Sequence, residues 1–127
     1  MNRRTVADHG TSSLSAEDLA ALRENLHEQR LFRQEQLRQI AGAACVAAGR
    51  AEGPSDEGAA SLTEVREKLA ASARMVLADV EAALSRMDQG RYGACRLCRR
   101  PVARERLMIV PQARYCARCQ QVREADR

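Results

Sequence analysis

The chain has 127 residues, of which 45% are apolar and 2% aromatic, and its formal net charge is +4. This length suits about one domain, and the apolar share excludes a compositionally disordered chain. Much of that share is alanine, which favours helix but buries little surface, so the composition argues against a thick globular core. Long helices packed along a narrow seam fit it better. No apolar run reaches the 18 or more residues of a membrane span, and we expect no membrane association.

Residues 1–14 are polar and show no periodicity, so we expect a polar N-terminal tail. The first residues, MNRRTVADHGTSS, also lack the apolar segment of a signal peptide. We therefore expect a cytoplasmic protein. Disulfides are rare in that compartment, and paired cysteines there usually take part in metal or redox chemistry.

A first long helix is predicted from residue 15 to residue 48. Ser15 followed by Asp18 has the form of a capping box, which is a helix start signal. The apolar residues that follow share one face at helical spacing, interrupted by Gln29 and Arg33. They are Leu19, Leu22, Leu26, Leu37, Ile40 and Ala44. A helix of this length is about 50 Å long.

The segment GRAEGPSDEGAAS, residues 49–61, is rich in glycine, proline and charge and predicts a turn. A second helix is predicted from 62 to 88, ending before Gly90. Its apolar face contains Leu62, Val65, Leu69, Val76, Val80, Ala83 and Met87, with Ser72 and Ala73 at its narrowest point.

Two long helices joined by a short turn should fold back on each other, each burying the apolar face of the other. We therefore expect a mainly α protein, with a long antiparallel coiled-coil hairpin over residues 15–90 and its tip at 49–61. A free-standing hairpin, which would be a monomer, and one side of a bundle completed by another subunit both remain open.

Several residues lie outside this pattern. Leu31, Phe32 and Met75 point away from the apolar faces, and either contact the tail or the cysteine-rich module or bind a partner. Cys45 lies among alanines and is expected to be a small packed or half-exposed thiol. His9 and His27 lack metal-ligand partners and are expected to be ordinary surface residues.

Four of the five cysteines form two Cys-x-x-Cys pairs, Cys95/Cys98 and Cys116/Cys119, with seventeen residues between them. This spacing suits tetrahedral Zn²⁺, because each pair can aim two thiolates at one ion. Residues 91–127 are too poor in large apolar side chains to fold on a core of their own, and zinc binding would supply about 10–16 kcal/mol. A redox pair is the rival interpretation, but it needs a βαβ scaffold that this sequence does not predict. Four cysteines close the coordination shell, so the zinc is expected to be structural.

The C-terminal part is also strongly basic. Residues 91–127, which we expect to form a four-cysteine zinc-finger module and a C-terminal helix, hold ten arginines against Glu105, Glu124 and Asp126. The arginines around the ligands are Arg96, Arg99, Arg100, Arg104, Arg106, Arg114 and Arg118. They fit nucleic-acid phosphates, an acidic protein or a solvated face. With few aromatics and no recognition helix we expect no sequence-specific DNA binding, and with no catalytic motif we expect no enzyme.

The stretches DQGRYGACRLC and RLMIVPQARYCARCQ, preceded by a long helical hairpin, resemble the DksA/TraR family of bacterial zinc-finger transcription regulators. The resemblance covers residues 15–121. Beside the four cysteines, the matching residues are Gly90, Tyr92, Gly93, Arg106, Leu107, Pro111 and Ala113. Arg99 departs from the pattern, since many relatives have glycine after the second cysteine.

This resemblance implies a regulator of transcription initiation that binds RNA polymerase rather than reading DNA. The hairpin would enter the secondary channel of the polymerase, with the zinc module at the channel rim. In several members the alarmone ppGpp strengthens the effect. The alternative is a zinc-stapled coiled-coil adaptor that binds another protein or, non-specifically, nucleic acid.

Two departures limit what the resemblance implies. The family's tip commonly reads Asp-x-x-Asp-x-Ala, whereas here DEGAAS keeps only the first acid, Asp56. Asp56 and Glu57 are therefore the candidate tip residues that approach the polymerase's catalytic metal, with ordinary solvation of a loop as the alternative.

The second departure concerns the alarmone. The basic positions that nucleotide-binding relatives use fall here on Asp79, Val110 and Gln120. One acid and two neutral residues cannot supply the charge-assisted hydrogen bonds that a tetra-anion needs. We therefore expect little or no ppGpp binding at that site.

Overall fold

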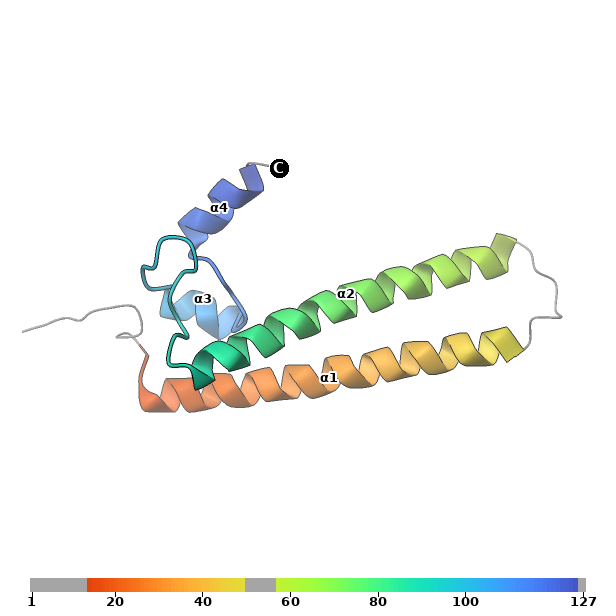
Figure 1. Ribbon diagram of the computed structural model, residues 1–127, viewed down its shortest axis with the longest axis horizontal. Helices are drawn as coiled ribbons and strands as arrows, with labels where there is room; N and C mark the ends of the chain where they lie inside the picture. The colour runs from red at the N-terminus through yellow and green to blue at the C-terminus, as the bar shows by residue number, and fades with distance from the viewer. Residues whose placement is uncertain (1–13, 50–56, 126–127) are drawn as a thin grey trace, which may run out of the picture. The chain divides into compact units, whose positions relative to one another are not determined.

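The structure is a computed structural model that describes residues 14–49 and 57–125, except for the side chains of Glu57 and Ala59. Four helices follow one another in these residues: α1 (Ala16–Gly49), α2 (Glu57–Asp88), α3 (Arg104–Ile109) and α4 (Ala117–Ala125) (Figure 1). The predicted mainly α class is confirmed. None of the helices in these two ranges is both long and apolar enough to cross a membrane.

The start of α1 is the predicted capping box. The backbone N–H of Asp18 donates to Ser15 Oγ at 3.0 Å, and the backbone N–H of Ser15 donates to Asp18 Oδ2 at 3.1 Å. Two N–H groups that an isolated helix end would leave unpaired are thereby satisfied. The tail predicted at 1–14 lies outside the described residues except for Leu14.

Helix α2 begins at Glu57, whereas the sequence pattern predicted residue 62. Residues 57–61 read EGAAS, and their alanines are strong helix formers. In the sequence pattern, the turn signal of the neighbouring glycine and proline hid this helix preference. The tip predicted at 49–61 is therefore too long, because Gly49 still belongs to α1 and 57–61 belong to α2. Residues 50–56 lie outside the described part of the chain.

The end of α2 is built around Gly90, as predicted. Gly90 has a φ of 74°, in the left-handed region that favours glycine. The backbone N–H of Gly90 donates to Met87 O at 3.1 Å, and the N–H of Arg91 donates to Arg86 O at 2.8 Å. This pair of bonds is a Schellman motif, which satisfies carbonyls at the helix end and turns the chain away.

The chain divides into two compact units. Unit 1 consists of Met1–Glu28 and Asp79–Arg127, and unit 2 consists of Gln29–Ala78. In unit 1, Arg23 near the start of α1 forms an ion pair of 3.1 Å with Asp88 at the end of α2. The two helices are therefore antiparallel, and the predicted hairpin is confirmed.

Unit 1 buries apolar residues from α1, α2, α3 and the loop between α2 and α3. Its buried residues are Leu22, Leu26, Val80, Ala83, Leu84, Tyr92, Cys95, Val102 and Leu107. Val80 and Ala83 of the predicted α2 face are among them. The ends of the two long helices therefore share a core with the cysteine-rich segment.

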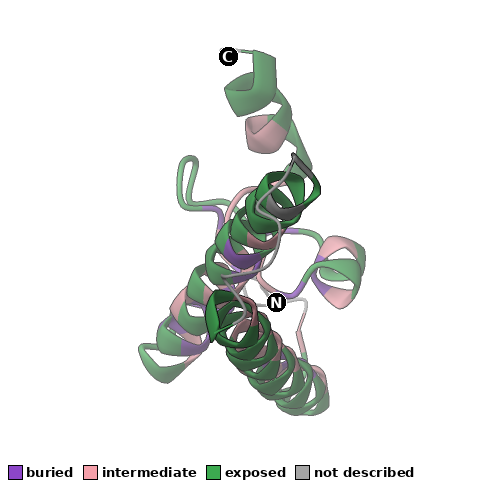
Figure 2. Ribbon diagram, turned by 90° about the vertical axis from the view of Figure 1, so that its right-hand side faces the viewer, coloured by how far each residue is buried: buried purple, intermediate pink, exposed green. Residues whose placement is uncertain are grey.

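Unit 2 is packed much more thinly. Among its described residues the buried side chains are Ala70 and Ala73, while Leu62, Val65 and Leu69 are 50%, 50% and 49% exposed. The prediction that these three form the buried face is wrong. Small residues at a helix contact allow a short interaxial distance, which leaves larger neighbours at the rim. Leu31, Phe32 and Met75 are also exposed, and Figure 2 shows exposed residues over most of the helical ribbon.

Asp18 also joins α1 to α3 within unit 1. Arg104 donates from Nε and Nη2 to the two carboxylate oxygens of Asp18, each at 2.9 Å. These bonds, together with the N–H of Ser15, lower the pKa of Asp18 far below its usual range. One carboxylate therefore caps a helix and binds a side chain 86 residues away.

We predict that Asp18→Asn destabilises the protein at neutral pH. Because the folded-state pKa of Asp18 is lowered, the carboxylate contributes stability above the ordinary aspartate pKa of about 3.9 and loses it as the pH falls through the lowered value. Urea unfolding should show a gap between wild type and Asp18→Asn at pH 7 that narrows in acid. Glu17→Gln, in the same helical turn, is the matched control. An equal loss in both variants would contradict the role of the Arg104 pair.

Candidate metal centre

Two short backbone turns position the four cysteines. In the first, the N–H of Cys95 donates to Arg100 O at 2.8 Å and the N–H of Arg99 donates back to Cys95 O at 3.0 Å. The second turn opens α4, where the N–H of Gln120 donates to Cys116 O at 2.9 Å. A bond of 2.9 Å from the N–H of Arg96 to Arg114 O joins the two segments. The two Cys-x-x-Cys pairs are thereby brought together.

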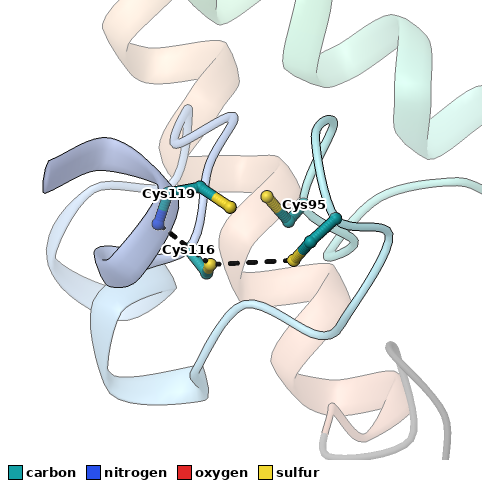
Figure 3. A group of neighbouring side chains, drawn as sticks. Cys95, Cys116 and Cys119 are labelled. Carbon is teal, nitrogen blue, oxygen red and sulfur yellow. Dashed lines mark hydrogen bonds between the residues drawn. The ribbon is translucent and has the colours of Figure 1, made fainter. Parts of the chain in front are cut away.

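The sulfur atoms of Cys95, Cys98, Cys116 and Cys119 all lie within 4.8 Å of one another. Cys98 Sγ and Cys116 Sγ are 3.8 Å apart, and the labelled side chains in Figure 3 point toward a common centre. A disulfide would need about 2.05 Å. Four ligands at a Zn–S distance of about 2.3 Å would place their sulfurs about 3.8 Å apart. The four residues therefore fit one tetrahedral zinc ion.

Neighbouring groups shift the pKa values of two of the four thiols. Burial acts to raise the pKa of the Cys95 thiol, but N–H groups of Cys98, Cys116 and Leu97 outweigh it and lower that pKa to about 6. Hydrogen bonding to the Cys116 side chain, followed by burial, raises the pKa of Cys119 to about 12. The pKa values of the Cys95 and Cys119 thiols are thus shifted in opposite directions. A bound divalent cation would stabilise the thiolate form of all four cysteines, because thiolates are its ligands.

Buried side chains hold the segment that separates the two cysteine pairs. Tyr92 is 3% exposed and its hydroxyl donates to Pro111 O at 2.7 Å. Burial raises the pKa of Tyr92 to about 12. Arg106 donates from Nε to Tyr115 O at 3.1 Å, next to Cys116. The motif residues Tyr92, Arg106 and Pro111 therefore position the second cysteine pair.

Arg86 is a buried cation that the sequence pattern did not reveal. It is 4% exposed, its Nη2 donates to Ala113 O at 3.4 Å, and its Nη1 has no partner within the described residues. Burial lowers its pKa first, and the charges of Arg96 and Arg114 lower it further. Arg96 and Arg114 therefore add positive charge to the surroundings of a cation that is already buried. In the sequence, Arg86 is one of many arginines and lies near a predicted helix end, so its burial could not be predicted.

Asp79, Val110 and Gln120, the positions identified by counting from the cysteines, line one pocket of about 370 Å³. Three arginines line it too: Arg106, Arg114 and Arg123. Arg114 donates from Nη2 to Asp79 Oδ1 at 2.6 Å, and the Arg123 guanidinium lies 4.7 Å from the centre of the Tyr115 ring. The sequence analysis missed this Asp79–Arg114 ion pair, which links α2 to the segment before the second cysteine pair.

The other candidate residues lie elsewhere. Asp56 is outside the described residues, and Glu57 is the first residue of α2, with a side chain that is not described. Cys45 is an exposed free thiol on α1 and is not part of the four-cysteine group. His27 is exposed, as expected, and His9 is outside the described residues.

We predict that Cys98→Ser lowers bound zinc from one ion per chain to substoichiometric levels and unfolds the segment around residues 90–125. Three thiolates cannot close the shell, and this segment lacks a core that would replace it. Cys45→Ser removes a thiol outside the group and should leave zinc content unchanged. Elemental analysis of the purified variants, with circular dichroism before and after chelation, measures both effects. Equal zinc in the two variants would contradict the assignment.

Comparison with known proteins places this geometry in a family. Residues 90–125 match the prokaryotic dksA/traR C4-type zinc finger. An uncharacterized protein of Aquifex aeolicus (strain VF5) is 37% identical over 43 residues, which is 34% of this chain and only 30% of that relative's length.

A solved structure extends the likeness beyond the zinc finger. The transcription factor DksA2 from Pseudomonas aeruginosa superimposes with a TM-score of 0.71 and 27% sequence identity, over 88% of this chain and 87% of that chain. The shared fold therefore includes the helices as well as the cysteine-rich segment. Together with the zinc-finger match and the four clustered cysteines, it supports a DksA-like, zinc-binding chain with the fold of a transcription regulator.

Proposed function

We propose that this protein regulates transcription initiation, without catalysing a reaction, by binding RNA polymerase through its secondary channel. The observation that carries the proposal is the structural agreement with the transcription factor DksA2 over 88% of the chain. A shared zinc finger alone would leave the helices unexplained. A coverage of 88% is far more than the zinc finger alone and therefore includes helical parts of the chain.

The helices have suitable dimensions and surfaces for such a role. Helix α1 has 34 residues, which corresponds to about 51 Å at 1.5 Å per residue. Unit 2 exposes Leu31, Phe32 and Met75. Large apolar side chains that do not serve the chain's own core are available to a partner that surrounds the helices.

In this proposal Zn²⁺ is a structural ion, bound by Cys95, Cys98, Cys116 and Cys119. The ion supplies the folding free energy that residues 90–125 cannot obtain from a core of their own. Four thiolates leave no open coordination position for a substrate. The zinc finger therefore holds its own segment in shape against the ends of α1 and α2, which share its compact unit.

Asp56 and Glu57 are the proposed acidic tip. Glu57 is the first residue of α2, and Asp56 precedes it in the sequence. The end of a hairpin where its two helices are joined is the part that would reach furthest into a channel. A carboxylate there can interact with a divalent cation at the polymerase's catalytic centre. Only the first acid of the family's tip motif is present, so the negative charge comes from two neighbouring residues.

The test is a titration of the zinc-loaded protein against bacterial core RNA polymerase, with transcription from a ribosomal promoter as the second readout. We expect wild type to bind and to change transcription. The double variant Asp56→Ala/Glu57→Ala should bind within about threefold of wild type but lose the transcriptional effect. Glu64→Ala/Glu67→Ala removes the same charge from the exposed side of α2 and should behave as wild type.

The outcomes separate the parts of the proposal. Absence of polymerase binding by wild type would overturn it in favour of an adaptor with another partner. A double variant that regulates as wild type would keep the binding but remove the tip from the mechanism.

We further propose that ppGpp contributes little at the family's usual site. Asp79 places a carboxylate in the pocket, and Arg114 is already engaged with it in an ion pair of 2.6 Å. An alarmone would have to break this pair and approach the carboxylate. Isothermal titration should detect no micromolar binding to the protein–polymerase complex beyond that of polymerase alone.

The matched variant for this prediction is Asp79→Lys/Val110→Arg/Gln120→Lys, which restores three basic positions. It should gain ppGpp binding by at least tenfold, because each added cation can form a charge-assisted hydrogen bond with phosphate. Micromolar binding by the unaltered complex that disappears in Arg106→Gln would contradict the proposal.

A further inference from the structure

Four arginines on the zinc finger have free guanidinium groups. Arg96, Arg99, Arg100 and Arg118 are exposed, and none of their side chains forms a hydrogen bond or ion pair with another described residue. By contrast, Arg104 is paired with Asp18 and Arg114 with Asp79. Some arginines of this segment are therefore paired with carboxylates of the same chain, whereas these four are available to bind a partner.

The four come from two distant stretches of sequence that meet at the cysteine cluster. Each is one or two residues, about 4–8 Å of chain, from a cysteine whose sulfur belongs to the cluster. The bond from the N–H of Arg96 to Arg114 O holds the two stretches together at 2.9 Å. We call this set the arginine face (Arg96, Arg99, Arg100 and Arg118).

Arg99 occupies a backbone position that suits glycine better. Its φ is 67°, and it is the only non-glycine residue with positive φ in the described ranges. Its N–H closes the first cysteine turn by donating to Cys95 O at 3.0 Å. Glycine would make the same bond without steric cost, and the arginine side chain forms no hydrogen bond or ion pair with a described residue that would compensate. Strain of this kind indicates that the side chain itself has a use.

The field at this end of unit 1 is positive. The pKa of buried Arg86 is lowered first by burial and then by the charges of Arg96, Arg114 and Arg91. Among residues 91–125 the only acidic residues are Glu105 and Glu124, and Gln120 donates to Glu124. A dense array of negative charge is therefore the complementary partner.

We propose that the arginine face binds the phosphodiester backbone of duplex DNA without reading its sequence. Guanidinium groups bind phosphate in a bidentate manner, and duplex DNA presents about one negative charge per 1.7 Å of axis, enough to engage all four. The proposal goes beyond binding to polymerase, because it gives the outer surface of the zinc finger a partner of its own.

The aromatic residues favour a duplex over a single strand. Single-stranded nucleic acid is held largely by base stacking on exposed aromatic rings. Here Tyr92 is buried, and the Tyr115 ring is covered by the Arg123 guanidinium at 4.7 Å. Three of the four arginines lie on a turn rather than on a helix that fits the major groove, so backbone contact is the available mode.

The experiment uses the zinc-loaded full-length protein and a fluorescent 20-base-pair duplex of mixed sequence, without polymerase. Four phosphate contacts predict a slope of about −3.6 for log affinity against log salt. Affinity should therefore fall on the order of 150-fold between 50 and 200 mM salt. Binding should be the same for unrelated duplex sequences. A slope near zero would overturn the proposal, whatever the outcome with polymerase.

Arg99→Gly separates a binding role from a structural one. It should reduce the magnitude of the salt slope by about 0.9 while leaving the thermal unfolding temperature equal to or above that of wild type. Arg74→Gln, an exposed arginine on α2 in unit 2, removes the same charge and should leave the slope unchanged. An equal loss in both variants would show a general charge effect and contradict the arginine face.

Two further probes test the choice of partner. Single-stranded DNA and RNA of the same length should bind more weakly than the duplex at equal salt, and tighter binding would contradict the duplex assignment. Polyglutamate should compete poorly. If it binds as tightly as DNA and loses affinity equally in Arg99→Gly, the partner is an acidic protein surface and the proposal fails.

Discussion

The zinc-finger part of this protein depends on the convergence of four cysteine sulfurs within 4.8 Å. Few large side chains are buried beside them, chiefly Tyr92, Val102 and Leu107. Such a small core does not offset the conformational entropy of ordering the segment. Metal binding makes up this difference, because four thiolates at this spacing are stable together only around a cation.

This dependence extends into the long helices. The bond from Arg86 to Ala113 O and the Asp79–Arg114 pair attach α2 to the segment before the second cysteine pair, and the Asp18–Arg104 pair attaches α1 to α3. All six residues belong to one compact unit. The helix ends and the zinc finger therefore form a single structural element, whereas unit 2 holds its helices with an alanine seam and leaves larger apolar residues exposed.

Features that depend on neighbouring residues were predictable. The Ser15/Asp18 capping box, the end of α2 before Gly90 and the grouping of the four cysteines each follow from spacings of a few residues or from a ligand pattern. The start of α2 was not predicted, because glycine and proline signals next to residue 57 hid the helix-forming alanines. Leu62, Val65 and Leu69 have helical periodicity, but periodicity identifies a face without showing that a neighbouring helix covers it.

The sequence by itself determined the helical class, the cysteine cluster and the excess of positive charge, because composition and short spacings carry these properties. Which charged side chains form ion pairs is known from the tertiary structure alone. Asp79 and Arg114 are 35 residues apart, and Asp18 and Arg104 are 86 apart, so no local pattern links them. Their pairing leaves Arg96, Arg99, Arg100 and Arg118 free, and the same packing buries Arg86. Such differences among chemically identical side chains arise from contacts between distant segments, which sequence spacing does not encode.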